Sequence, residues 1–213
     1  MSARDDILHA IRTQRVKTAT RPQLYRPPVI DGAPADFFAA RAIAAHASVT
    51  TITAMDDVPG AVAEVLRRAN LELRVHAPSS AFDELDWPKA GIVVDRNAPG
   101  PDDAALAIAP IGIAETGTLV YPAATARPAS WHFRAGLEIA VLREDAIVNH
   151  LEDALARLRH NGAVLPHTVN LVTGPSRTGD IEQTMELGAH GPKALAILIV
   201  KNQDTGNAPK RSA

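Results

Sequence analysis

The chain contains no cysteine among its 213 residues. Disulfide bonds, thiolate nucleophiles, cysteine-ligated zinc and ordinary iron–sulphur clusters all require cysteine sulphur, so this sequence holds none of them. A redox pathway that uses this protein must therefore place such a centre on another chain.

Aromatic residues are also scarce, at 4%, although apolar residues together make up 46% of the sequence. Ala, Val, Leu and Ile must then supply most of the core. The longest apolar runs, such as Ala194–Val200, are far shorter than the roughly 20 residues of a membrane-spanning helix. The N-terminal residues 1–6 lack the apolar run of a signal peptide. We expect a cytoplasmic protein without membrane insertion.

An excess of charge of either sign is absent as well. The 22 basic and 24 acidic residues give a formal net charge of −2. A nucleic-acid partner or an anionic membrane surface would call for a basic patch, so neither is expected. The length fits one compact domain with a sizeable core.

The pattern along the chain divides it into three parts. Residues 1–34 comprise an amphipathic helix, expected at Ala3–Val16, and an arm rich in Pro and Arg. The apolar residues of the arm show neither helical nor strand periodicity. Residues 35–202 alternate helical and extended patterns, and residues 203–213 form a polar tail that we expect to be disordered. Apolar strands alternating with helices predict an α/β sheet covered on both faces.

Apolar spacing places the individual elements. Helices are expected at Asp36–Ala47, Val58–Ala69, Glu144–Arg159 and Thr178–Leu187. Strands are expected at Ser48–Ala54, Leu71–His76, Gly91–Asp95, Ala104–Ala109, Gly117–Tyr121, Leu137–Leu142, Thr168–Thr173 and Leu195–Val200. The region Gly112–Tyr121 suggests an antiparallel excursion on the sheet.

The first candidate site is the segment AETGT at residues 114–118. Glu115 follows an apolar run, and Thr116 and Thr118 flank it closely. One interpretation is a general base, nucleophile or ligand-binding carboxylate that the two hydroxyl groups orient. The other is a tight turn with a solvated carboxylate. The segment alone does not decide between them.

The second candidate site is the segment TGPSRTGDIE at residues 173–182, which is expected to leave a strand and open a helix. Free N–H groups at a helix start bind anions, and Arg177 adds a bidentate donor, with Ser176 and Thr178 as further contacts. Asp180 and Ile181 stand where a P-loop needs Lys and Ser or Thr, which argues against nucleoside triphosphates. The alternative is ordinary helix capping, with Arg177 paired to a nearby carboxylate.

His190 lies between two glycines after the expected helix and is a candidate acid, base or ligand. The remaining histidines show no paired spacing on one helix or strand face, so we expect no metal site. No G-x-G-x-x-G motif follows an expected strand, so no dinucleotide site is expected either.

Three ordered blocks resemble one family. They are AETGTL at 114–119, GPSRTGDIE at 174–182 and LGAHGPKAL at 187–195, and together they resemble the LUD-domain family of lactate utilisation protein C (LutC). The departures are Gly179, where the family commonly has Ala, and ASWHFR at 129–134, where the family is rich in Leu and Pro. The second departure affects whatever substrate specificity that stretch carries.

The resemblance implies a fold of the NagB/RpiA/CoA transferase-like class, a sheet flanked by helices, here with an N-terminal helix and arm. It also implies a role in oxidising L-lactate to pyruvate, together with partner subunits that carry iron–sulphur clusters. This chain would then be a non-redox subunit with no cofactor of its own. A small carboxylate substrate would be held at Arg177, with Glu115 exchanging a proton.

Two other hypotheses remain open. In the first, the chain is an assembly subunit whose N-terminal helix and arm dock the partners. In the second, it is a stand-alone enzyme that binds a phosphosugar or a CoA ester, as other proteins of this fold class do.

Overall fold

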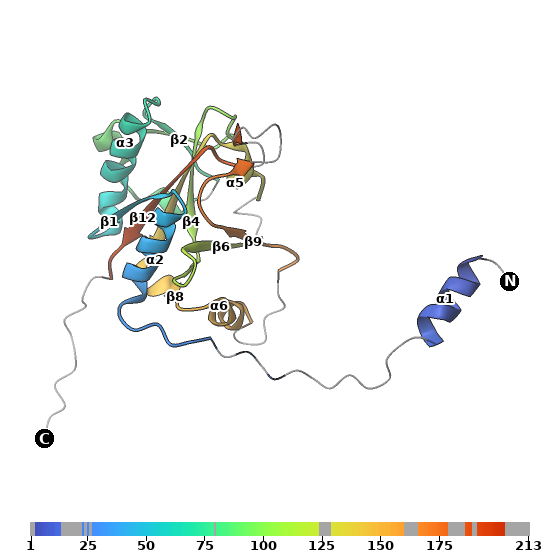
Figure 1. The fold of residues 1–213 in the computed structure, drawn as a ribbon. Coiled ribbons are helices and arrows are strands. Elements are labelled where there is room, and N and C mark those ends of the chain that lie inside the picture. Colours follow the sequence, from blue (N-terminus) through green and yellow to red (C-terminus); the bar gives the residue numbers. More distant parts are fainter. Residues whose placement is uncertain are drawn as a thin grey trace, which may run out of the picture.

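A computed structural model describes residues 3–13, 23, 25, 27–78, 80–123, 129–159, 166–178, 186–188 and 191–202. Its centre is a six-stranded sheet in the order β1-β12-β7-β4-β2-β3, in which every neighbouring pair is parallel (Figure 1). These strands are β1 (Ser48–Ile52), β2 (Arg74–His76), β3 (Val93–Asp95), β4 (Ala104–Ala109), β7 (Leu137–Arg143) and β12 (Ala194–Val200).

A second, four-stranded sheet has the order β8-β5-β6-β9. Its strands are β5 (Ile111–Ile113), β6 (Thr118–Pro122), β8 (Ile147–Val148) and β9 (Val169–Val172). β6 is antiparallel to both β5 and β9, so the predicted antiparallel excursion exists, but it builds a sheet of its own. The short strands β10 (Arg177–Thr178) and β11 (Glu186–Leu187) form a separate antiparallel pair.

The helices cover these sheets, except for the first, which has no buried residue in the part of the chain that the structure describes. They are α1 (Ala3–Thr13), α2 (Pro34–Ala44), α3 (Val58–Arg68), α4 (Trp87–Ala90), α5 (Ala129–Arg134) and α6 (Leu151–Leu158), with single 3-10 turns η1 (Met55–Asp57), η2 (Ser80–Phe82) and η3 (Glu144–Ala146). Within the described residues, no helix is long and apolar enough to cross a membrane.

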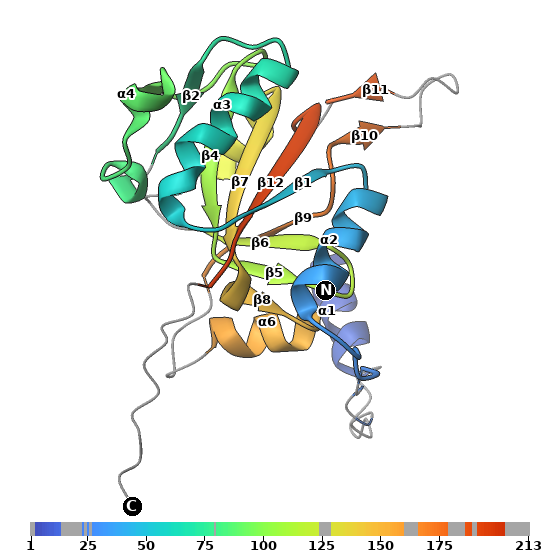
Figure 2. The ribbon, with the colours of Figure 1, turned by 90° about the vertical axis from the view of Figure 1, so that its left-hand side faces the viewer.

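The layers follow from the alternation of side chains along the central strands. On β7, Leu137, Ile139 and Val141 pack under α3 and α4, whereas Ala140 and Leu142 face α2 and the smaller sheet. A third apolar cluster lies between α6 and the outer face of the smaller sheet (Figure 2). Because β4, β7 and β12 are buried on both faces, their sequences are almost wholly apolar, with Glu138 on β7 as the internal exception, and this explains why the sequence predicted them well.

Two predicted helices differ from the structure. The stretch Glu144–Arg159 begins as η3 and the strand β8, and helix forms only from Leu151. The helix predicted at Thr178–Leu187 is wrong at both ends, because Arg177–Thr178 pairs as a strand with Glu186–Leu187. The anion site expected at a helix start on Thr178 therefore has no helix there.

The N-terminal segment divides into two parts. In the described structure, no residue of α1 is buried, and its apolar residues Ile7 and Ile11 are 60% and 61% exposed. Ile30, near the end of the arm, packs instead against the core between the two sheets. The arm thus joins the domain just before α2, and α1 keeps its apolar side chains in solvent.

Candidate functional site

A chain of three threonine hydroxyls joins the first two candidate segments. Thr116 Oγ1 lies 2.7 Å from Thr118 Oγ1, which lies 2.7 Å from Thr173 Oγ1. Thr116 lies in the turn before β6, Thr118 is the first residue of β6, and Thr173 follows β9 directly. The antiparallel pairing of β6 and β9 thus brings together segments that are 55 residues apart.

Two glycines allow these segments to lie directly against the end of α2. Gly117 and Gly174 have φ angles of 67° and 70°, which favour glycine. A Cβ on Gly117 would overlap the Ala42 backbone, and one on Gly174 would overlap the Ala45 carbonyl oxygen. Both turns are therefore fixed against the same helix terminus.

Glu115 is bound to the start of α6. Its Oε1 accepts a hydrogen bond from the Leu151 backbone N–H at 3.0 Å, and its Oε2 lies 2.8 Å from His150 Nδ1. A carboxylate is favourable at this helix N-terminus, where Asp153 also accepts from the His150 N–H. Both Glu115 oxygens thus have structural partners, and a catalytic role for Glu115 stays a prediction.

The electrostatics of this pair are reciprocal. Burial by itself raises the pKa of Glu115, but the hydrogen bonds from His150 and Leu151 outweigh it and leave that pKa lowered. The hydrogen bond to Glu115 raises the pKa of His150 against the opposing effect of burial, and the Pro28 carbonyl of the arm raises it further. The pair therefore favours its charged form.

The third sequence block meets the second one across a tight backbone contact. The Ser176 N–H donates to the Pro192 carbonyl at 2.9 Å, and the Gly188 N–H donates to the Ser176 carbonyl at 3.1 Å. A pocket of about 210 Å³ opens at this junction. Its lining comes from α5, from β9 and the turn after it, and from the 191–192 turn: His132, Phe133, Leu171, Val172, Thr173, Gly174, Pro175, Ser176, Gly191 and Pro192.

A buried ionisable network involves one residue of that lining. His132 Nδ1 lies 2.9 Å from Glu138 Oε1, and the two side chains are only 4% and 0% exposed. The Tyr121 ring stacks on the His132 ring at 4.0 Å between centroids and 28° between planes. Burial first, and then the negative charge of Glu138, raise the pKa of Tyr121 well above its usual value.

Two atoms of this network, the Tyr121 hydroxyl and Glu138 Oε2, make no hydrogen bond of ordinary geometry within the described residues. In addition to burial, however, an interaction between the Tyr121 hydroxyl and the Glu138 carboxylate raises the pKa of Tyr121. Buried polar atoms in proteins are nearly always paired with good geometry, so this loosely paired cluster inside the core is unusual. Sequence reasoning missed all three residues of the network. The available signal was a single carboxylate inside the apolar strand LEIAVL, six residues after a histidine.

The remaining predicted site residues lie at different places relative to the pocket. Ser176 lines the pocket, and Arg177 is exposed at the start of β10 directly after it. Only the backbone of Thr178 is described, and His190 lies outside the described residues. Among those residues, no group of three His, Asp or Glu side chains is placed to hold a metal ion.

The family is settled by comparison with known proteins. A family model described as the LUD domain matches residues 36–200. The chain belongs to the LUD domain family. All three sequence blocks, the pocket and the buried network lie inside the matched LUD domain.

Several relatives found for this LUD domain carry the name lactate utilization protein C, and another is an uncharacterized protein of Neisseria meningitidis serogroup B. Lactate utilization protein C of Geobacillus thermodenitrificans (strain NG80-2) is 32% identical over 101 residues, covering 46% of this chain and 42% of that protein. Lactate utilization protein C of Bacillus subtilis (strain 168) is 29% identical over 131 residues, covering 55% of each chain. The chain thus spans about half the length of the curated relatives it matches.

A solved structure supports the fold. The crystal structure of a DUF162 family protein from Deinococcus radiodurans matches with a TM-score of 0.56 and 22% identity, covering 81% of this chain and 99% of that one. At this identity the likeness shows the fold alone. It agrees with the predicted α/β class, a parallel sheet flanked by helices.

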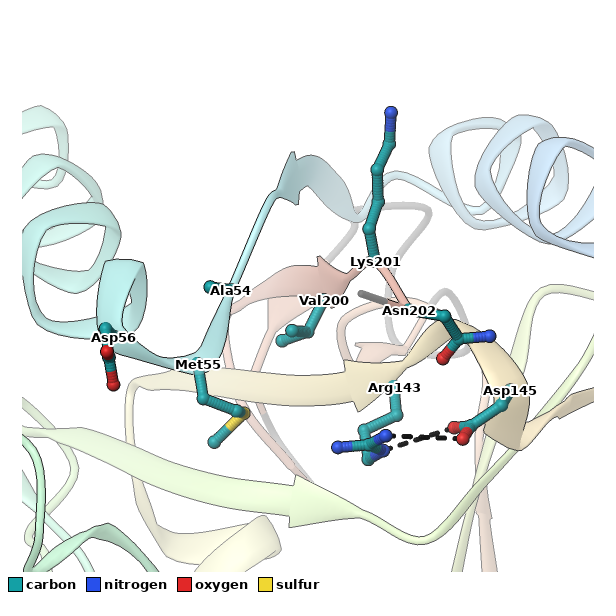
Figure 3. Close-up of a pocket in the computed structure, with 8 residues that line it drawn as sticks. All are labelled: Ala54, Met55, Asp56, Arg143, Asp145, Val200, Lys201 and Asn202. Atoms are coloured by element: carbon teal, nitrogen blue, oxygen red, sulfur yellow. Dashed lines mark hydrogen bonds and ion pairs between the residues drawn. The ribbon is translucent and has the colours of Figure 1, made fainter. Parts of the chain in front are cut away.

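A second, larger pocket of the LUD domain lies at the carboxyl ends of β1, β7 and β12 (Figure 3). It encloses about 580 Å³. Arg143 is paired with Asp145 across it at 3.2 Å, and both side chains are at least half exposed. Figure 3 shows Lys201 pointing away from the Arg143–Asp145 pair.

Proposed function

We propose that this protein serves lactate utilisation as a subunit without a redox centre of its own. It would bind a small carboxylic acid in the 210 Å³ pocket, while partner subunits with iron–sulphur clusters carry the electrons. One observation carries this proposal: in a LUD domain, the second and third sequence blocks line one pocket, and Thr118 of the first block is hydrogen-bonded to Thr173, the residue directly before the second block. The names of the relatives supply the substrate.

The composition supports the division of labour. A chain without cysteine cannot ligate an ordinary iron–sulphur cluster, so lactate-derived electrons would have to leave through another subunit. The pocket volume is below the roughly 300–1,000 Å³ typical of pockets for drug-sized ligands, which suits an acid of a few heavy atoms.

Growth on lactate tests the proposal. Deleting the gene should abolish growth on L-lactate as sole carbon source but not on a sugar, and the wild-type gene should restore it. A pocket-filling variant, Leu171→Trp, should fail to restore growth. Val93→Trp is its matched control, because Val93 is likewise a 52% exposed apolar residue, but it lies on the edge strand β3. Unimpaired growth of the deletion strain on lactate would refute the proposal.

The same proposal includes Glu115 as a general base. The support for this role comes from the sequence pattern around Glu115. Its oxygens already bind His150 and Leu151, so proton transfer would require one of these bonds to break. Glu115→Gln is nearly isosteric and separates the roles. Loss of lactate-dependent growth at an unchanged melting temperature would support the assignment of Glu115 as general base, whereas unaltered growth would refute that assignment.

A second candidate function follows from the pocket in Figure 3. Ligands of open α/β sheets bind at the carboxyl ends of the strands, and about 580 Å³ is large enough for a phosphosugar. A stand-alone enzyme of this kind predicts thermal stabilisation of the isolated protein by phosphosugars or CoA esters, reduced in Arg143→Gln. No stabilisation across such a panel would exclude it.

A further inference from the structure

Glu138 is an ionisable residue in the least suitable place for one. It lies on β7, between β4 and β12, and faces the interior between the two sheets with no solvent exposure. Removing a carboxylate from water costs several kcal/mol unless the protein supplies partners, as order-of-magnitude estimates for buried ions indicate. Here one oxygen meets His132, and the other makes no hydrogen bond of ordinary geometry in the described chain, although the carboxylate also interacts with Tyr121. Packing alone gives no reason for a carboxylate at this position.

The geometry of His132 suggests what the carboxylate does. A carboxylate accepts hydrogen bonds, so the 2.9 Å contact is made by Nδ1–H donating to Glu138 Oε1. This fixes the tautomer and leaves Nε2 as an acceptor on a residue that lines the pocket. The stacked Tyr121 ring holds the plane of the imidazole. A buried acid that orients a histidine in this way is how many enzymes prepare a proton acceptor.

The rest of the lining indicates the ligand. Phe133 and Leu171 offer exposed apolar surface, at 45% and 52% exposure, which suits a short carbon chain. Ser176 lines the same pocket, so a hydroxyl group lies at that end, where the carboxylate of a ligand would bind. The volume of about 210 Å³ has room for a few heavy atoms beyond these contacts.

We propose that the pocket binds a small 2-hydroxy acid whose hydroxyl group faces His132, with His132 as the catalytic proton acceptor and Glu138 as its positioning residue. This rests on the proposed function and specifies its site. In the step, Nε2 takes the hydroxyl proton while the carbon-bound hydrogen leaves with its electron pair to a two-electron hydride acceptor of the flavin class on a partner subunit. Such an acceptor is required because one-electron iron–sulphur clusters cannot accept a hydride. The hydroxy acid is oxidised to a 2-oxo acid, the acceptor is reduced by two electrons, and the imidazolium then releases its proton to water.

Binding is tested first on the isolated full-length protein. In protein labelled with ¹⁵N-histidine, the His132 imidazole signals are assigned by their loss in His132→Gln. L-Lactate should shift these signals saturably, and propionate, which lacks the hydroxyl group, should bind about tenfold more weakly, since one hydrogen bond is lost. His167→Gln, at an exposed histidine, should leave the His132 response unchanged. Silent His132 signals, or equal affinity for propionate, would overturn the site.

Turnover is tested next, in extracts of the deletion strain that carry each variant, as L-lactate-dependent dye reduction. Glu138→Gln keeps the volume but removes the charge, so kcat should fall about 100-fold while KM stays within about threefold of wild type. His132→Gln should lose turnover to a similar extent. If the melting temperature of Glu138→Gln is well below that of wild type, the conclusion rests on His132→Gln alone. Unchanged kcat in a folded variant would refute the proposal that His132 and Glu138 act together in catalysis.

The two proposals fail in different ways. If wild type restores growth on lactate but the His132 and Glu138 variants do so equally well, only the catalytic role of His132 and Glu138 is refuted. If wild type plays no part in lactate growth but His132 still responds to hydroxy acids, the site stands and the lactate pathway is wrong.

Discussion

The Nδ1 atom of His132 lies 2.9 Å from Oε1 of a glutamate, Glu138, whose side chain has no contact with solvent. The pair connects the middle of the parallel sheet to a pocket that two separated sequence blocks line. Apolar residues of similar volume could fill this place without the cost of burying a charge, and the members of the pair come from different elements, α5 and β7. Function is therefore the simplest reason for keeping it.

Breaking the pair should destabilise the protein. Glu138→Ala removes one partner and leaves the buried imidazole unpaired, so the free energy of unfolding should fall by roughly 3 kcal/mol. Urea unfolding followed by circular dichroism measures this. The control is Glu64→Ala, whose exposed ion pair with Arg68 should contribute at most about 0.5 kcal/mol. Equal effects in the two variants would show that the buried pair is not formed.

The Glu115–His150 pair predicts a window of pH-dependent stability. The pKa of Glu115 is lowered from 4.5, so its contribution is present above that pH and is lost as pH falls through the folded value. The pKa of His150 is raised from 6.5, so its contribution is complete below 6.5 and is lost as pH rises through the folded value. The pair therefore stabilises most between pH 4.5 and 6.5.

A comparison of variants checks this window. The difference in unfolding free energy between wild type and Glu115→Gln should be larger inside the window than about two pH units above it. The charged groups around His150 are Glu115 and Asp153, and both favour its protonated form. Glu84→Gln, at an exposed glutamate, should show no such trend. A difference that is constant with pH would contradict the pairing.

Glycine is required at the second sequence block. Gly174→Ala places a methyl group on the Ala45 carbonyl oxygen and forces a side chain into φ of 70°, so it should cost roughly 2 kcal/mol or more. Gly60→Ala in α3 is the matched control, because a Cβ there meets nothing within 4 Å and alanine favours helix. We expect a lower melting temperature for the first variant and an equal or higher one for the second.

The N-terminal helix should be dispensable for folding. Deleting residues 1–26 removes α1 but keeps Ile30, which packs on the core, so the melting temperature should change by less than about 2 °C. If the exposed Ile7, Leu8 and Ile11 dock partner subunits, the truncated protein will lose co-purifying chains. Retention of the partners would locate the dock elsewhere, and a large loss of stability would show that α1 packs on the domain.

Much of the fold could be predicted from the sequence, for a physical reason. Strands buried on both faces are apolar along nearly their whole length, so runs such as Leu195–Val200 can be recognised from the sequence alone. The helix expected at Thr178–Leu187 failed because short strands at its two ends pair with each other, and such pairing depends on contacts that local spacing does not encode.

The site was only half predictable. Ser176 stood out because polar residues after a strand suggest a binding loop, and it does line the pocket. Glu138 and His132 did not stand out, since a single carboxylate in a strand usually marks an exposed face. Its burial follows only from the position of β7 between β4 and β12, which the order of strands in the sequence does not reveal.

Purification from lactate-grown cells tests the central claim most directly. The protein is tagged, isolated gently under anaerobic conditions and assayed for L-lactate-dependent dye reduction, with identification of the chains that co-elute. The account predicts activity together with iron–sulphur partner subunits, and loss of that activity in Leu171→Trp. A lone, inactive chain recovered from cells that oxidise lactate would contradict it.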